Sequence, residues 1–181
     1  LLRRRGADGA AGEEAEEEDD AGGAEAVDLR AEVVLDSNVS SELCLPPAQA
    51  GAQRCVLLTG ANGFLGTYLL RALLDSTRSR VACLVRARSD GEASDRLQKA
   101  MRDQGIWKER YAAQIEVLAG DLECAHLGLE EDAWEALARR VDAIVHNGAF
   151  VHWMFPYARL RAANVGGTHE VLRLACARKL K

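Results

Sequence analysis

The sequence predicts an α/β protein built around a doubly wound parallel sheet. Two observations carry this prediction. Short apolar runs alternate along the chain with longer segments whose apolar residues recur at helical spacing. A glycine-rich turn follows the first of these apolar runs. Strands that alternate with helices in this way favour a parallel sheet with right-handed crossovers and helices on both faces.

Charge divides the chain near residue 50. Residues 1–50 carry 13 acidic and 4 basic side chains, whereas residues 51–181 carry 15 and 19. The acidic, Ala/Gly-rich part cannot bury apolar surface, so residues 1–50 are predicted to be a disordered acidic tail and linker. An acidic interaction tail is the alternative to a solvated linker. Residues 51–181 are predicted to form the folded domain.

The predicted strands are short, apolar and bounded by turn or charged residues. They are Arg54–Thr59, Arg80–Val85, Ile115–Ala119 and Asp142–His146. The predicted helices are Phe64–Ser76, Ser89–Gln104, Asp132–Arg139 and Tyr157–Arg178. In a sheet of this kind, a ligand lies in the crevice at the strand C-termini, where the strand order reverses beside the first strand.

The loop after the first strand predicts a nucleotide-phosphate site. Glycines at 60, 63 and 66 stand between a predicted strand and a predicted helix. In a Rossmann-type fold they allow, in order, a tight turn, close approach to a pyrophosphate, and close packing of the helix, whose N-terminal N–H groups face the phosphates. Thr67 and Tyr68 exclude a Walker loop, which needs Lys and Ser/Thr there. A glycine-rich turn without a ligand is the alternative.

Arginine after the second strand favours NADP over NAD. Arg86 lies twenty residues beyond Gly66, where an NAD-selective site has Asp or Glu to hold the ribose 2′-OH. A guanidinium there favours a 2′-phosphate instead. Arg96, on the helix that follows, is a candidate second donor. The alternative for both arginines is an ordinary solvated surface charge.

The ends of the third and fourth strands suggest the two remaining parts of a dinucleotide site. Asp121 could accept a hydrogen bond from an adenine amino group while Leu122 packs on the ring; alternatively, Asp121 caps a turn. The small residues from Asn147 to Ala149 would let the nicotinamide half lie against the backbone. Alternatively, Asn147-Gly148 is a simple turn dipeptide.

Composition argues against several other classes of protein. No run approaches 18 apolar residues, so no membrane span is predicted, and the histidines lack metal-site spacing. The cysteines show no C-x-x-C spacing, and Cys55, Cys83 and Cys176 are expected to be core residues in a reducing compartment. We therefore expect a soluble, cytoplasmic protein without a nucleic-acid partner.

Six motifs, taken in order, resemble the thioester reductase domains of the extended short-chain dehydrogenase/reductase group. They are the Gly60/Gly63/Gly66 loop, Leu-Val-Arg86-Ala, Gly-Asp121-Leu, His-Asn-Gly-Ala149, Pro156-Tyr157 and Asn164-Val-Gly-Gly-Thr168. Such domains terminate nonribosomal peptide synthetases and polyketide synthases, carboxylic acid reductases and aminoadipate reductases. The resemblance begins near Asp28, because residues 28–36 look like the segment that joins a carrier domain to its reductase.

The resemblance implies that NADPH reduces an acyl thioester presented by an acyl-phosphopantetheine carrier domain, giving an aldehyde and in some members an alcohol. Asn164 matches an Asn that braces the active-site wall; an Asn bonded to the backbone at a helix start is the alternative. The cofactor-binding residues implied are Thr59, Gly60, Asn62, Gly63, Phe64, Leu65, Gly66, Arg86, Arg96, Asp121, Leu122, Asn147, Gly148, Ala149 and Asn164.

Two departures from the family pattern affect the predicted chemistry. His152 stands where the family often has Asn, and we expect it to pack on Trp153 rather than to contact substrate. The family's catalytic Ser/Thr and its Tyr-x-x-x-Lys pair would follow Lys181, so no catalytic residue is predicted here. Tyr157 with Arg161 does not replace that pair, and Tyr157 is expected to anchor the loop or contact substrate.

We therefore expect the cofactor-binding part of a larger multidomain reductase, truncated before its catalytic helix. One alternative is a fatty acyl-CoA reductase or another extended short-chain reductase. The other is a truncated, non-catalytic nucleotide-binding or scaffold protein.

Overall fold

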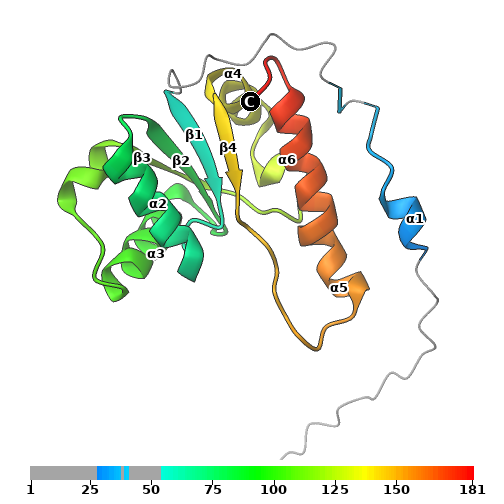
Figure 1. Ribbon diagram of the computed structural model, residues 1–181, viewed down its shortest axis with the longest axis horizontal. Coiled ribbons are helices and arrows are strands. Elements are labelled where there is room, and N and C mark those ends of the chain that lie inside the picture. Colours follow the sequence, from blue (N-terminus) through cyan, green and yellow to red (C-terminus); the bar gives the residue numbers. More distant parts are fainter. Residues whose placement is uncertain (1–27, 38, 41–53) are drawn as a thin grey trace, which may run out of the picture. The chain divides into compact units, whose positions relative to one another are not determined.

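A computed structural model describes residues 28–37, 39–40 and 54–181 of the chain. The described residues contain a sheet of four parallel strands in the order β3-β2-β1-β4 (Figure 1). The strands are β1 (Cys55–Thr59), β2 (Arg80–Val85), β3 (Ile115–Ala119) and β4 (Ala143–His146). The order reverses between β1 and β4, as the predicted doubly wound fold requires.

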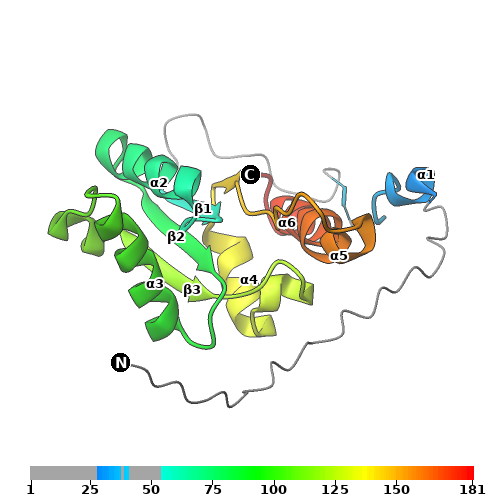
Figure 2. The same ribbon diagram turned by 90° about the horizontal axis from the view of Figure 1, so that it is seen from below.

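Helices cover both faces of the sheet (Figure 2). One face carries α2 (Phe64–Ser76) and α3 (Asp90–Asp103), and the other carries α4 (Glu131–Arg140) and α6 (Gly167–Cys176). Two 3₁₀ helices, η1 (Glu109–Ala113) and η2 (Ala125–Gly128), flank β3. The predicted α/β fold is confirmed.

Alternate strand residues supply two separate hydrophobic cores. Leu58 and Cys83 face α2 and α3, whereas Leu57 and Leu84 face α4 and α6. Consecutive strand side chains point to opposite faces, so both faces of a covered parallel sheet must be apolar. This explains why β1 and β2 appear in the sequence as unbroken apolar runs.

The predicted helix Tyr157–Arg178 is wrong in its continuity. The structure divides it into α5 (Tyr157–Arg161), a π-helical turn η3 (Ala162–Gly166) and α6. The Gly167 N–H donates to the Ala162 carbonyl five residues back, which defines the wide turn. A Cβ on Gly167 would lie 2.9 Å from the Leu122 Cβ, so the helix passes very close to the loop after β3.

Most other predicted boundaries agree within two residues, but several short elements were not predicted. These are η1, η2 and α1 (Leu29–Glu32), a single turn whose N-terminal N–H at Arg30 donates to the Asp28 carboxylate. The acidic residues from Glu13 to Asp20, part of the predicted tail, lie outside the described residues. The division into a linker at 1–50 and a domain at 51–181 stays a prediction.

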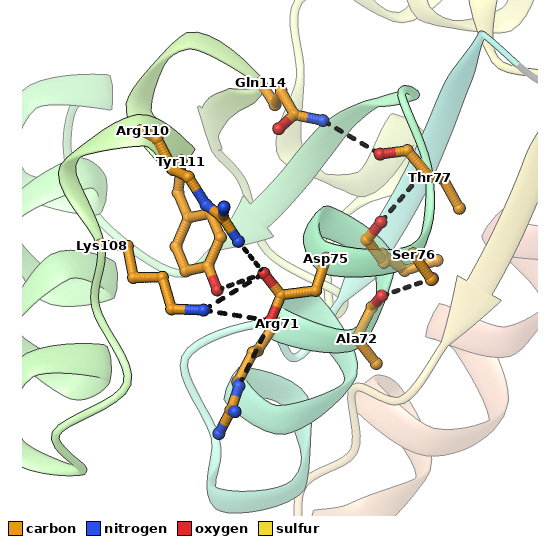
Figure 3. Close-up of polar contacts among 10 residues, drawn as sticks. Arg71, Ala72, Asp75, Ser76, Thr77, Lys108, Arg110, Tyr111 and Gln114 are labelled. Atoms are coloured by element: carbon orange, nitrogen blue, oxygen red, sulfur yellow. Dashed lines mark hydrogen bonds and ion pairs between the residues drawn. The ribbon is translucent and has the colours of Figure 1, made fainter.

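The Asp75 carboxylate and the basic and hydroxyl groups around it connect η1 to the C-terminal end of α2 (Figure 3). Asp75 accepts hydrogen bonds from the Tyr111 hydroxyl at 2.8 Å and from Arg110 at 2.5 Å. Lys108 and Arg71 add ion pairs at 3.3 and 3.5 Å. The Tyr111 hydroxyl, followed by Arg110 and Lys108, lowers the pKa of Asp75 to about 2. The cluster lies where α2 leads into β2, away from the strand C-termini.

Candidate functional site

A cavity of about 380 Å³ opens at the C-terminal ends of the strands. It lies beside β1, at the point where the strand order reverses, and the loops that follow all four strands contribute to it. Its lining residues are Gly60, Asn62, Gly63, Phe64, Leu65, Leu84, Arg86, Gly120, Asp121, Leu122, Glu123, Asn147, Gly148, Ala149, Phe150, Val151 and Ala163.

The loop after β1 leaves no room for side chains at two positions. Gly60 has a φ of +65°, and a Cβ there would lie 2.7 Å from the Gly148 Cα. A Cβ on Gly66 would overlap the Gly60 carbonyl oxygen. Gly66 thus lets α2 begin directly against the loop, and Gly60 lets the loop after β4 approach the end of β1.

Helix α2 presents its N-terminus to the cavity. Its N-cap is Gly63, which has no side chain to accept the first helical N–H groups, and the first turn contains no acidic residue. The first N–H groups of a helix have no partner within it and carry a partial positive charge. An anion in the cavity is therefore favoured next to Phe64 and Leu65, the first two residues of this helix.

Thr59 joins the end of β1 to the loop after β4. Its Oγ1 accepts the N–H groups of Asn147 at 3.1 Å and Gly148 at 2.9 Å, and it lies 2.7 Å from His146 Nδ1. The Asn147 side-chain amide donates to the Gly60 carbonyl at 3.3 Å. The two loops that face each other across the switch point are therefore held in one register.

The network around His146 fixes one tautomer of its ring. Thr168 Oγ1 donates to the Asn164 carbonyl at 2.6 Å, so it can only accept from His146 Nε2, which lies 3.4 Å away. His146 Nδ1 is then the acceptor for the Thr59 hydroxyl. Burial lowers the pKa of His146 below its ordinary value, which favours this neutral ring.

Asn164 braces the loop beyond β4 from the π-helical turn η3. Its Oδ1 accepts from the Phe150 N–H at 2.7 Å, and its Nδ2 donates to the Phe150 carbonyl at 3.0 Å. Asn164 does not itself line the cavity, but Phe150 does. Asn164 therefore bonds to the backbone of a cavity-lining residue from inside the helical segment rather than from a helix start. Its role at a cofactor stays a prediction.

His152 does not pack on Trp153, contrary to the sequence-based expectation. Its ring stacks on Phe155 with centroids 3.6 Å apart, while Trp153 is 97% exposed. The reason is local: the His152 Nδ1 accepts the Met154 N–H, and the turn this closes brings residue 155 over the imidazole. Trp153 is left at the loop tip.

Arg86 reaches the cavity, and Arg96 supports it from behind. Arg96 donates to the Arg86 carbonyl at 2.7 Å and pairs with Glu92 at 2.6 Å. Arg96 does not line the cavity. The Arg86 side chain is 67% exposed, and its guanidinium lies 3.6 Å from the Glu123 carboxylate. Arg86 therefore provides a cation at the end of β2, and Arg96 fixes its backbone.

Behind Asp121, a left-handed turn shapes the loop after β3. His126 and Leu127 have φ values of 53° and 59°, which are unusual for residues other than glycine. The Leu127 carbonyl accepts the Asp121 N–H at 2.8 Å, and Glu170 on α6 accepts the His126 N–H at 2.8 Å. These bonds hold Asp121 and Leu122 at the cavity wall.

Most of the sequence-predicted site residues come together at this cavity. Thr59, Gly66, Arg96 and Asn164 are placed directly behind it, and the other eleven line it. Sequence reasoning missed Leu84, Gly120, Glu123, Phe150, Val151 and Ala163. Gly120 and Glu123 flank the predicted pair Asp121-Leu122 in the sequence, so the neighbours of a predicted contact were a usable signal.

The described part of the chain contains no group of three or more metal-binding side chains. Within the same residues, no helix combines the length and apolar character needed to cross a membrane.

Residues 58–181 match the model of an NAD-binding domain family that is described as male sterility protein. The chain belongs to this family. The family indicates a nicotinamide dinucleotide as cofactor, which agrees with a cavity built on a glycine-rich loop and a helix N-terminus.

This NAD-binding family member matches short segments of much longer proteins. The chain is 44% identical over 136 residues to the L-2-aminoadipate reductase large subunit of Penicillium chrysogenum, covering 74% of this chain and 10% of that protein. It is 45% identical over 155 residues to a linear gramicidin synthase subunit of Brevibacillus parabrevis, covering 84% of this chain and 3% of that protein. The chain thus spans a tenth or less of these relatives.

Solved reductase domains share the fold. The terminal R domain from the myxalamid PKS-NRPS biosynthetic pathway matches with a TM-score of 0.82 and 42% identity, over 84% of this chain and 39% of that one. The reductase (R) domain of a non-ribosomal peptide synthetase from Mycobacterium tuberculosis gives a TM-score of 0.68 and 41% identity, over 81% and 36%. Sequence and fold therefore group this family member with reductase domains of the nonribosomal peptide synthetase and aminoadipate reductase type.

Proposed function

We propose that the chain is the cofactor-binding domain of an NADPH-dependent reductase that releases a carrier-bound acyl thioester as an aldehyde or alcohol. The observation that carries the proposal is the cavity at the switch point, which combines a glycine cradle, the N-terminus of α2 and the Arg86 guanidinium. Residues 51–181 would form this domain, with residues 1–50 as a linker.

The cavity fits NADPH in charge and shape. The absence of side chains at Gly60 and Gly63, with the start of α2, suits a pyrophosphate. Arg86 suits a 2′-phosphate, and Asp121 with Leu122 suits adenine. Asn147, Gly148 and Ala149 would lie along the nicotinamide half. NADPH bound in this way supplies the hydride that a thioester carbonyl accepts.

The residues of this chain would hold and orient the cofactor rather than transfer protons. A developing alkoxide needs a proton donor, which the resembled family takes from a Tyr-x-x-x-Lys pair. None of the three tyrosines, Tyr68, Tyr111 and Tyr157, has a lysine four residues later. The proposal therefore assigns no catalytic residue to this chain.

An acyl-carrier domain is the proposed partner. The segments that match this chain lie within much longer proteins, which supports a multidomain parent. The resemblance of residues 28–36 to a carrier-to-reductase connection supports a substrate delivered on a phosphopantetheine arm. A free acyl-CoA is the competing substrate class, and binding without turnover is the competing non-enzymatic role.

The test is a reduction assay on the full-length native protein. It is given an acyl group as the thioester of a carrier domain or as acyl-CoA, with NADPH or NADH, and aldehyde or alcohol is measured by mass spectrometry. We expect NADPH-dependent product from the carrier thioester. Product from acyl-CoA alone would favour an acyl-CoA reductase. NADPH binding without any product from either thioester would favour the non-catalytic role.

A further inference from the structure

A carboxylate faces the arginine of the proposed 2′-phosphate site. Glu123 and Arg86 both line the cavity, and their charged groups lie 3.6 Å apart. Their side chains are 38% and 67% exposed, so water reaches the pair. An exposed pair of this kind is weak and can exchange partners.

Backbone contacts hold both residues at this end of the cavity. The Asp121 carboxylate accepts the Glu123 N–H at 3.0 Å, and the Asp121 carbonyl accepts the Cys124 N–H at 3.2 Å. On the other side, Arg96 donates to the Arg86 carbonyl at 2.7 Å. The two side chains therefore meet because two anchored loops bring them together.

Other carboxylates near Arg86 already have partners. Glu92 accepts from Arg96 at 2.6 Å and from the Arg88 N–H at 2.9 Å, and Asp90 accepts the Ala119 N–H at 2.7 Å. Among the described residues, Glu123 is the acidic partner that the structure gives to Arg86. This makes Glu123 the residue that a 2′-phosphate would displace.

We propose that Glu123 is a specificity-determining residue that weakens the preference for the 2′-phosphorylated dinucleotide. The inference rests on the proposed function. In the free protein Glu123 occupies Arg86, and with cofactor bound its charge repels a 2′-phosphate. A ribose 2′-OH lacks that charge and can instead donate to a carboxylate. Glu123 therefore limits the NADPH/NADH affinity ratio that Arg86 alone would give.

The test compares Glu123→Gln with wild type in the full chain by calorimetric titration of NADPH and of NADH. Removing one negative charge beside a solvated phosphate should raise the NADPH/NADH affinity ratio about three- to tenfold, and the gain should shrink at high salt. Glu130→Gln is the control, because it makes the same change outside the cavity lining. It should leave the ratio within about twofold of wild type.

A second background separates this inference from a general charge effect. With Arg86→Ala already present, Glu123→Gln should raise the ratio less than it does in wild type, since the competition for Arg86 is gone. An unchanged or lowered ratio in Glu123→Gln would overturn the inference. So would an equal rise in Glu130→Gln.

The same titrations distinguish failure of the inference from failure of the proposed function. If neither wild type nor Glu123→Gln binds NADPH more tightly than NADH, the proposed cofactor assignment fails, and the role of Glu123 fails with it. If wild type prefers NADPH and Glu123→Gln leaves that preference unchanged, only the role of Glu123 fails.

Discussion

At Gly66, the space that any side chain would need is occupied by the loop after β1. A Cβ would overlap the Gly60 carbonyl, so Gly66→Ala should push α2 away from the loop. We expect a loss of about 1–3 kcal/mol in the free energy of unfolding and at least about tenfold weaker NADPH binding. Chemical denaturation and calorimetry would measure these effects.

Gly91→Ala is a matched control, because its Cβ would meet nothing closer than the Ser89 Oγ at 3.9 Å. Gly91 lies inside α3, so this change should leave binding unaltered and raise stability by up to about 1 kcal/mol. Equal losses in Gly66→Ala and Gly91→Ala would contradict the steric argument.

Arg86 provides a direct test of cofactor choice. Charge-assisted bonds to phosphate contribute about 1.5–3 kcal/mol, so Arg86→Ala should weaken NADPH binding about 10- to 100-fold while NADH changes little. The nearby Arg88→Ala removes an exposed guanidinium that does not line the cavity, and it should change neither affinity by more than about threefold. An unaltered NADPH/NADH ratio in Arg86→Ala would remove the assigned role.

His146 should make stability depend on pH. Burial lowers its pKa in the folded protein below the ordinary 6.5, so the unfolded chain takes up a proton first as pH falls. The stability that depends on neutral His146 is complete above about pH 6.5 and decreases as pH falls below it. Denaturation of His146→Gln should show a smaller decrease between about pH 6.5 and 5, while His152→Gln, at an exposed loop position, should match wild type. Parallel curves for wild type and His146→Gln would contradict this.

At the scale of elements, Asp75 links α2 to η1. The Tyr111 hydroxyl and its basic neighbours lower the pKa of Asp75 from 3.8 to about 2. Its charged form therefore stabilises the fold above about pH 3.8, and this contribution is lost as pH falls toward 2. Asp75→Asn should lower Tm at neutral pH, with the difference from wild type shrinking below pH 3.8.

Asp103→Asn tests whether the Asp75 effect comes from the cluster rather than from any lost surface charge. Asp103 makes a single exposed pair with Lys99 one turn away on α3. Such pairs contribute little, so Asp103→Asn should leave Tm nearly unchanged. If both variants lowered Tm equally, η1 would not depend on Asp75.

Strands β1 and β2 were predictable because burial on both faces makes them nearly continuous apolar runs. Strands β3 and β4 are only partly buried, and they were predictable as short, mainly apolar segments between turn or charged residues.

The wide turn within the last helix was not predicted. Asn164, Val165 and Gly166 are weak helix formers, but they do not by themselves distinguish a π-helical turn from an α-helix. The contacts of this segment with Phe150 and Leu122 come from distant parts of the chain. The left-handed turn at His126 and Leu127 was not predicted either, because a contact far away in the sequence holds it. It depends on Glu170, which is 44 residues away from His126.

The site was predictable where local sequence determines it. The spacing after the predicted strands indicates where the glycines and Arg86 lie. For Asp121 the sequence left a turn cap as the alternative, and the structure shows that this residue both accepts the Glu123 N–H and lines the cavity. The network of Thr59 with His146 was not predicted, because it joins strand ends 87 residues apart in the chain. The pair of Arg86 with Glu123 likewise requires knowledge of how two loops face each other.

The C-terminal ends of the four strands bring together the glycine loop, the N-terminus of α2 and the Arg86 side chain around one cavity. Two helix layers hold the sheet, and the loops after the strands enclose the cavity. Asp75 and the side chains that contact it do not line this cavity. We therefore expect Asp75→Asn to leave the NADPH/NADH affinity ratio unchanged in the same titrations.

Calorimetric titration of the full chain with NADPH and with NADH tests the proposed cofactor site most directly. We expect one binding site and tighter binding of NADPH, with the preference reduced in Arg86→Ala. Equal affinities, or binding that Gly66→Ala and Arg86→Ala leave unchanged, would contradict this expectation.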